Sequence, residues 1–197
     1  MLRLVDLIAR KNGSIAVEFA LVAPIMVGLF FGLSELALAL GAKGDTTNLA
    51  SVGADLIAQE STATTADMSN VFGALSAMLY PYPTTNAQIT ISSVLDNSSG
   101  GATGNANPTG TIAWSCTQGG TARAPASTYS FPAAAQGVVT SNSGGSVIMA
   151  EVSYTYTMAF AANIPGVTSL SGPFTFSNTF YSKPRKVLQV TAPTACP

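Results

Sequence analysis

The feature that most constrains this chain is an apolar run near its N-terminus. Phe19–Leu33 is fifteen consecutive residues without a polar side chain, and residues 36–40 extend the run past Ser34 and Glu35. As a helix, Ser14–Leu40 would measure about 40 Å at about 1.5 Å per residue. The hydrocarbon core of a bilayer, about 30 Å thick, needs about 20 helical residues. We therefore predict a transmembrane helix over residues 14–40.

The charges that flank this run predict its orientation. Arg3, Arg10 and Lys11 precede it, and Asp6 is the only acidic residue among the first eleven. Because cytoplasmic flanks carry the excess of positive charge, we expect residues 1–13 in the cytoplasm and the chain after Leu40 in the periplasm. The prediction is a single-pass protein of a bacterial inner membrane.

The composition argues against catalysis. The 197 residues include no histidine and two cysteines, and the net charge is −1. Without histidine there is no Ser-His-Asp triad or Cys-His dyad, and two cysteines cannot complete a four-cysteine metal site. The charge balance lacks the basic footprint of a nucleic-acid binder. We predict a protein that is not an enzyme, with no cofactor, no metal and no nucleic-acid partner.

Glu18 is the residue that most needs an explanation, because a carboxylate in an apolar helix is costly unless it is paired. It could extend toward the cytoplasmic interface, one helical turn away. Alternatively, cleavage after Gly13 would give Ser14 a free ammonium group four positions before Glu18. Residues at this spacing share a helix face, so the two charges could neutralise each other. Between subunits, the same pair would select one axial register, because an unpaired buried charge is penalised.

The residues around Glu18 resemble a known family. Basic residues, Gly13, and then Glu18-Phe19 at the start of an apolar helix are similar to the class III signal of type IV pilin-like proteins. More closely, Gly13–Pro24 (GSIAVEFALVAP) resembles the opening of TadE-like proteins, the minor pseudopilins of the tight-adherence (Flp) pilus system. Glu35 matches the same pattern. The resemblance covers residues 10–40 well and the remainder only in outline.

The resemblance implies a function and a set of partners. It implies that a prepilin peptidase cuts between Gly13 and Ser14, and that Glu18 and Phe19 set the register of the helix in an assembly. It also implies contact with other pilins or pseudopilins and with the inner-membrane Tad machinery during Flp pilus assembly. No catalysis is implied.

Three residues inside the run bear on helix packing. Pro24, Gly28 and Gly32 are tolerated in membrane helices, where neighbouring groups satisfy the freed backbone. Gly28 and Gly32 form a small-xxx-small pair that lets another helix approach closely. The same glycines are also common in membrane helices that make no such contact.

Other interpretations remain open at this stage. Ala37-Leu38-Ala39 could be the cleavage site of a secretory signal, although this run is longer than a usual signal and contains an acidic residue. The helix could be an uncleaved anchor of a periplasmic scaffold or binding protein unrelated to pili. An exported enzyme would need paired carboxylates, for which Asp96 and Glu151 are the candidates in the sheet region.

Residues 41–80 are predicted to be helical with one break. Asp45-Thr46-Thr47 supplies cap chemistry, and apolar residues follow at helical spacing. The threonine-rich stretch 61–65 predicts the break, with Thr65 as the N-cap of a second helix that ends at Tyr80-Pro81. The expected apolar face of this helix comprises Met68, Val71, Phe72, Leu75, Met78 and Leu79.

Residues 84–197 alternate between apolar and polar side chains, which predicts an antiparallel sheet with one buried face. Four strands are expected, around Ile89–Leu95, Thr111–Thr117, Ser146–Phe160 and Phe174–Phe180. Ile112, Trp114 and Cys116 should share one side of their strand. The helix at 66–79 would cover the buried face. The predicted class is α+β: a long membrane-spanning helix, a broken helical continuation and a small sheet domain.

The cysteines and a basic cluster complete the prediction. In an oxidising periplasm, Cys116 and Cys196 could form a disulfide, with two free thiols as the alternative. The cluster Lys183-Pro184-Arg185-Lys186 is similar to the ending of TadE-like domains. It is expected either to be a solvated strand end or to contact an acidic partner or lipid headgroups.

Overall fold

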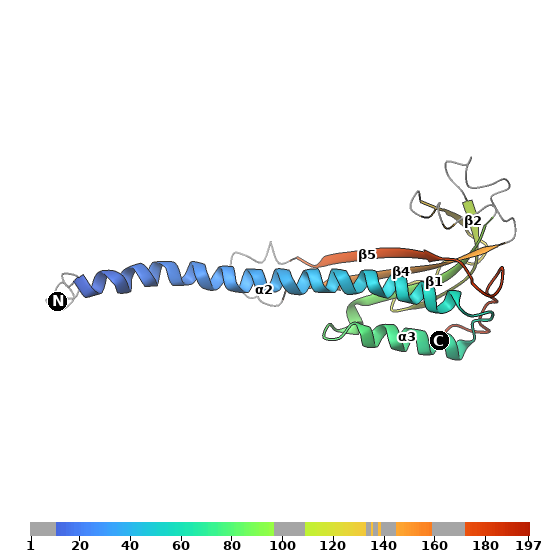
Figure 1. Ribbon diagram of the computed structural model, residues 1–197, viewed down its shortest axis with the longest axis horizontal. Coiled ribbons are helices and arrows are strands. Elements are labelled where there is room, and N and C mark those ends of the chain that lie inside the picture. The colour runs from blue at the N-terminus through green and yellow to red at the C-terminus, as the bar shows by residue number, and fades with distance from the viewer. Residues whose placement is uncertain (1–10, 97–108, 133–134, 136–137, 139–144, 159–171) are drawn as a thin grey trace. The chain divides into compact units, whose positions relative to one another are not determined.

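The computed structural model describes residues 11–96, 109–132, 135, 138, 145–158 and 172–197. These contain helices α2 (Lys11–Ala58) and α3 (Thr65–Met78) and a short 3-10 turn, η1 (Thr84–Asn86). The strands in the same residues are β1 (Ala87–Asp96), β2 (Thr109–Gln118), β3 (Thr128–Ser130), β4 (Ser146–Tyr156) and β5 (Phe174–Ser182) (Figure 1). The predicted α+β class, with a long apolar helix and an antiparallel sheet, is confirmed.

The chain divides into two compact units. The N-terminal unit comprises Met1–Leu40 and Thr157–Gly172, and the sheet unit comprises Gly41–Tyr156 and Pro173–Pro197. The division along the helix falls inside α2, between Leu40 and Gly41. Residues 41–80 and the strands that follow them are therefore parts of one unit.

In the N-terminal unit, α2 is apolar around its whole circumference. By length and composition it could cross a membrane, since its most apolar window of 18 residues has a mean hydropathy of 2.2. Pro24 lies inside the helix without ending it. Apolar residues on every side indicate a helix with apolar surroundings rather than one lying on a protein surface in water.

The cap predicted at Asp45-Thr46-Thr47 is wrong, because α2 passes through these residues without a new start. The hydroxyl of Thr46 donates to the carbonyl of Ala42 at 2.7 Å, and that of Thr47 to the carbonyl of Lys43 at 3.2 Å. Threonines inside a helix can bond to the preceding turn in this way, so they fit an uninterrupted helix as well as a helix start.

Helix α3 begins one residue earlier than predicted, with Thr64 rather than Thr65 as its N-cap. Thr64 is extended, and its side chain accepts from the backbone N–H of Asp67 at 3.1 Å. The Asp67 carboxylate in turn accepts from the backbone N–H of Thr64 at 3.0 Å, which completes a capping box. On the predicted apolar face, Met68, Phe72, Leu75 and Leu79 are buried, Val71 is half-buried and Met78 is exposed.

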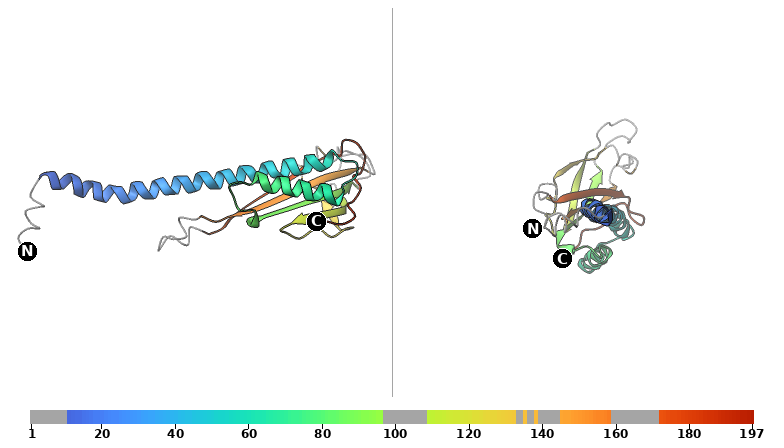
Figure 2. Two further views of the ribbon diagram at one scale, coloured as in Figure 1. Left: turned by 90° about the horizontal axis from the view of Figure 1, so that it is seen from below. Right: turned by 90° about the vertical axis from the view of Figure 1, so that its left-hand side faces the viewer.

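The five strands form one antiparallel sheet in the order β3-β2-β1-β4-β5. Within the sheet unit, the second half of α2 and all of α3 lie side by side on one face of this sheet (Figure 2). The two helices and the sheet lie close together at Gly53, where an added Cβ would lie 3.0 Å from Leu75 of α3 and 3.7 Å from Ala150 of β4. The sequence analysis predicted that α3 covers the sheet. It did not predict that the second half of α2 belongs to the same layer.

The main core lies between the two helices and the sheet. The helices contribute fully buried residues such as Leu49, Ile57 and Leu75. The sheet contributes alternating positions of its central strands, including Ile91 of β1 and its register partner Ala150 of β4. Burial of such apolar surface is the principal source of stability for a fold of this kind.

A second, smaller core lies on the opposite face of the sheet, so the prediction of a single buried face is wrong. Its buried members are Val94, Ile112, Phe131, Ala135, Val147 and Met149. Val94, Val147 and Met149 reach this face by ordinary alternation along β1 and β4. Ile112 joins them through a register shift: Ser93 pairs with Trp114, but the next residue, Val94, pairs with Ile112. Ala113 is the extra residue of a β-bulge, so Ile112 and Trp114 face opposite sides. Their predicted common face is therefore also wrong.

The strand predicted at Ser146–Phe160 ends earlier, at Tyr156. Met158 lies beyond the strand, and Phe160 lies outside the described residues. Strand β3 was not predicted, because three residues are too short to show a clear alternation. The other predicted strands coincide with β1, β2 and β5, and the predicted helix break coincides with the turn between α2 and α3.

Residues 183–197, which follow β5, cross the turn between α2 and α3, and we call this segment the strap. The backbone N–H of Arg185 donates to the carbonyl of Ala58, the last residue of α2, at 2.8 Å. Thr191 forms an isolated parallel bridge with Thr62, and the carbonyl of Val190 accepts from the indole of Trp114 at 3.0 Å. These bonds satisfy backbone groups in a segment that has no regular secondary structure.

Candidate functional site

The most extensive apolar surface among the described residues is the first half of α2. Large side chains are exposed on every side of it, including Ile15 at 70%, Phe19 at 70%, Phe30 at 69% and Leu40 at 58%. A contiguous surface of this kind is not stable in water and marks a contact with lipid or with another protein. We therefore treat residues 15–40 of α2 as the candidate functional site.

The structure places the residues of the predicted processing signal at the start of this helix. Gly13 and Ser14 are helical, and Ser14 precedes Glu18 by four residues, or about 6 Å along the axis. Glu18 and Phe19 are both exposed. The spacing therefore puts the backbone nitrogen of Ser14 on the same face of the helix as the Glu18 side chain.

The predicted packing residues lie on an open part of the helix. A Cβ added to Gly28 or Gly32 would meet no atom within 4 Å. Ser34, two residues after Gly32, donates its hydroxyl to the carbonyl of Phe30 at 3.1 Å, so its polar group is satisfied within the helix. Among the described residues, no side chain covers the strip formed by Gly28 and Gly32. Another helix could therefore approach there.

The two acidic residues of the run have different surroundings. Glu35 is 8% exposed, whereas Glu18 is exposed. A residue in contact with neighbouring subunits must be accessible on the isolated chain. Glu18 meets this requirement and Glu35 does not.

The two carboxylates considered for catalysis are far apart. Glu151 pairs with Thr90 across the sheet, and Asp96 lies six residues further along β1. At about 3.3 Å per residue, this separates them by about 20 Å. Carboxylate pairs that share a substrate in glycosidases lie within about 10 Å. Asp96 and Glu151 therefore cannot act together on one bond.

Glu151 is instead part of an ion pair that the sequence does not reveal. Its carboxylate accepts from Nε of Arg123 at 2.6 Å and from Nη2 at 2.5 Å. The hydrogen bonds to Glu151 raise the pKa of Arg123 above its usual value, and its guanidinium also lies 5.1 Å from the ring centroid of Tyr129. Twenty-eight positions separate the two partners, so no local spacing could have indicated the pair.

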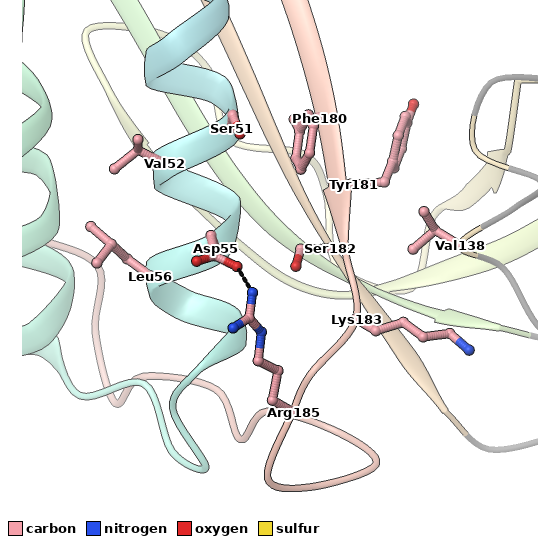
Figure 3. Close-up of a pocket in the computed structure, with 10 residues that line it drawn as sticks. All are labelled: Ser51, Val52, Asp55, Leu56, Val138, Phe180, Tyr181, Ser182, Lys183 and Arg185. Atoms are coloured by element: carbon pink, nitrogen blue, oxygen red, sulfur yellow. Dashed lines mark hydrogen bonds and ion pairs between the residues drawn. The ribbon is translucent and has the colours of Figure 1, made fainter.

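A groove of about 540 Å³ lies beside the C-terminal half of β5. Figure 3 shows the ion pair between Arg185 and Asp55 on one side of it and the phenol of Tyr181 pointing away. Burial, and next the hydrogen bond that it shares with Tyr129, raise the pKa of Tyr181, so this phenol stays protonated at neutral pH. The groove offers no activated nucleophile, and no group of three or more potential metal ligands occurs among the described residues.

The structure joins Cys116 and Cys196 by a disulfide with a Cα–Cα distance of 5.3 Å. Cys116 is buried on the helix-covered face of β2, so the bond fixes the end of the strap to the sheet. In the basic cluster, Arg185 has a structural role through its bonds to Asp55 and Ala58, while Lys183 and Lys186 remain exposed.

Residues 13–55 match the family described as TadE-like protein. This segment of the chain is therefore similar to TadE-like proteins. The match includes Gly13, Ser14, Glu18 and Glu35, and it continues past the apolar run into the part of α2 that packs on the sheet. It confirms the resemblance predicted from the sequence. No curated protein and no solved structure matches the chain.

Proposed function

We propose that this TadE-like protein is a minor pseudopilin of the Tad (Flp) pilus system, anchored in the inner membrane by residues 14–40. The single observation that carries the proposal is that the TadE-like match over residues 13–55 includes residues 15–40 of α2, whose large apolar side chains are exposed on all sides. The N-terminus lies in the cytoplasm and the sheet unit in the periplasm. The protein has a structural role in assembly and no catalytic one.

Cleavage after Gly13 by a prepilin peptidase prepares the helix for assembly. It removes Arg3, Arg10 and Lys11, which would otherwise hold the N-terminus at the cytoplasmic surface. It also creates an ammonium group on Ser14 one turn from Glu18. The exposed carboxylate of one subunit can then pair with this group on the same or a neighbouring helix, which fixes the axial register among pilins and pseudopilins.

Processing is tested by mass spectrometry of the protein from membranes that contain a prepilin peptidase. The mature chain should begin at Ser14. Gly13→Leu should retain residues 1–13, because a bulky side chain replaces the glycine at the cut site. Gly44→Leu, at a helix position with no atom within 4 Å of the added Cβ, is the matched control and should be processed normally. An intact leader on the unaltered chain would instead support an uncleaved scaffold protein.

Assembly is tested separately with Glu18→Gln, which keeps the shape of the side chain and removes its charge. This variant should be processed but should not enter the pilus fraction sheared from cells. Glu60→Gln alters an acidic residue of the sheet unit and should enter it normally. If Glu18→Gln is incorporated like the unaltered protein, the proposed register role of Glu18 is wrong.

A further inference from the structure

Aromatic side chains gather at one end of the sheet unit. Tyr80 and Tyr82 lie in the turn between α3 and β1, Tyr156 is the last residue of β4, and Phe174 is the first of β5. Tyr156 and Phe174 are register partners. The ring of Tyr82 packs edge-on against that of Tyr156 with centroids 6.3 Å apart. Four aromatic residues from three separate parts of the chain thus form one group, which we call the aromatic end.

The aromatic end contacts α2 at Gly41. A Cβ added to Gly41 would lie 2.5 Å from the phenol oxygen of Tyr82. The absence of a side chain at Gly41 therefore allows the tyrosine hydroxyl to touch the helix backbone. Burial and the nearby negative charge of Asp45 raise the pKa of Tyr82, so the phenol stays neutral and keeps its hydroxyl.

Gly41 also marks the point at which the chain leaves the bilayer, if the membrane span of the proposed function is correct. Leu40 is the last residue of the apolar run, and Lys43 and Asp45 are the first charged residues after Glu35. The polar headgroups must therefore lie close to residues 41–45. Since Tyr82 touches Gly41, connectivity alone brings the aromatic end to the membrane surface.

Three exposed side chains at the aromatic end support this placement, while Leu56, Phe180 and Leu188 are exposed elsewhere in the sheet unit. Tyr80 is 86% exposed, Met78 43% and Phe174 41%. All three lie at the aromatic end. The opposite end, where α2 stops at Ala58, instead carries the exposed cations Lys183 and Lys186. A tyrosine combines an apolar ring with a polar tip, and such residues are enriched where hydrocarbon meets water.

We propose that the aromatic end is a membrane-interface anchor, with Tyr80 and Phe174 inserted among the headgroups of the leaflet that faces the periplasm. The ligand is a phospholipid surface. The rings lie at the level of the glycerol and carbonyl groups, the phenol of Tyr80 bonds to ester or phosphate oxygens, and the exposed ammonium of Lys43 lies near the phosphates. The anchor holds the sheet unit against the membrane before the subunit enters the pilus.

The test measures the depth of single tryptophans in the full chain. The protein is reconstituted into vesicles of phosphatidylethanolamine and phosphatidylglycerol that contain phosphatidylcholine brominated either near the carbonyls or near the chain ends. Bromine quenches only nearby indoles. Trp114 is 6% exposed and present in every sample, so its signal is measured in the unaltered chain and subtracted. Far-ultraviolet circular dichroism and the intact disulfide confirm that each variant is folded.

Tyr80→Trp should be quenched several-fold more than Leu188→Trp, a control that is 69% exposed near the opposite end of the unit. Lipid brominated near the carbonyls should quench it most. Phe30→Trp, inside the span, should respond most to lipid brominated near the chain ends. Phe174→Trp repeats the test at the second anchor residue if Tyr80→Trp does not fold.

The outcomes separate this inference from the proposed function. If Phe30→Trp is quenched but Tyr80→Trp and Phe174→Trp are not, the span is correct and the anchor is wrong, and the aromatic end faces water or a protein partner. If Phe30→Trp is also unquenched, the membrane span itself is wrong. Strong quenching of Leu188→Trp would likewise overturn the anchor, because the whole unit would then lie on lipid.

Discussion

Among single residues, Glu18 and Glu35 show what spacing along the sequence can and cannot distinguish. Glu18 precedes the apolar run and Glu35 interrupts its extension, and both lie within residues 13–55, which match the TadE-like family. The distance from Gly13 singles out Glu18 as the partner of the N-terminus that the proposed cleavage would create, and its exposure fits that proposal. Nothing in the spacing indicates that Glu35 is 8% exposed, because burial depends on residues distant in the sequence. The structure therefore adds a difference in exposure to the difference in spacing that the sequence already shows.

The capping box of α3 gives a prediction at this scale. Thr64→Ala removes the hydroxyl that accepts from the backbone N–H of Asp67, and should lower the free energy of unfolding by about 1 kcal/mol. The measurement is urea denaturation of the detergent-solubilised chain, followed by the fluorescence of Trp114. Thr121→Ala, at an exposed position, should leave the midpoint unchanged. An equal loss in both variants would show that the cap makes no specific contribution.

The capping box of Thr64 and Asp67 also predicts that the stability of the fold depends on pH. The hydrogen bonds from the Thr64 side chain and backbone hold the pKa of Asp67 below its ordinary value of 3.8. The ionised carboxylate therefore stabilises the fold above about pH 4, and this contribution is lost as the pH falls through the lowered pKa. Asp67→Asn should show less loss of stability between pH 5 and pH 3 than the unaltered chain. A parallel decline in both proteins would contradict this.

Two glycines should respond to alanine in opposite directions. At Gly110, an added Cβ would lie 2.5 Å from the carbonyl oxygen of Leu95 and 2.8 Å from the ring of Phe131, so Gly110→Ala should destabilise the fold by about 1–3 kcal/mol. At Gly73, inside α3, it would meet no atom within 4 Å, so Gly73→Ala should stabilise by about 0.5–1 kcal/mol. Thermal unfolding followed by circular dichroism would measure both shifts. A shift of the same sign in both variants would contradict the packing around β2.

At the scale of elements, the sequence predicts each helix and long strand. It does not predict which side chains of every strand lie on which face of the sheet. Period-two alternation correctly indicates β1, β4 and β5. It fails at β2, because the bulge at Ala113 turns Ile112 toward the far side of the sheet. The second core around Phe131 combines Ile112, which the bulge turns, with Val94, Val147 and Met149, which face this side by ordinary alternation. The strap escapes prediction for a related reason, since its partners at Ala58, Thr62 and Trp114 are distant in sequence.

The disulfide and the ion pair that hold the strap give a prediction at the scale of elements. The disulfide between Cys116 and Cys196 closes a loop of 80 residues, which in the chain-entropy model is worth up to about 4.5 kcal/mol. Cys196→Ser should lower the free energy of unfolding by a large part of this amount. Arg185→Met breaks the exposed ion pair with Asp55 and should cost less than about 1 kcal/mol. Equilibrium denaturation without reductant compares the two, and an equal cost would contradict the covalent contribution.

For the whole molecule, the two units differ in what they expose. The large apolar side chains exposed in the N-terminal unit belong to residues 15–40 of α2, whereas the sheet unit keeps its apolar residues mostly between α2, α3 and the sheet. Leu49, Ala54 and Ile57 of α2 are fully buried in that layer. The second half of α2 is therefore held by tertiary packing and does not depend on the first half to remain helical.

It follows that a chain of residues 41–197 should fold without a membrane. Produced under oxidising conditions, it should be soluble without detergent, elute as a monomer in size-exclusion chromatography and unfold in one cooperative transition. The full chain should require detergent under the same conditions, because residues 15–40 expose a continuous apolar surface. Aggregation of the shorter chain with its disulfide formed would mean that residues 41–197 do not fold independently. The division of the molecule at Leu40 would then be wrong as a boundary of independent folding.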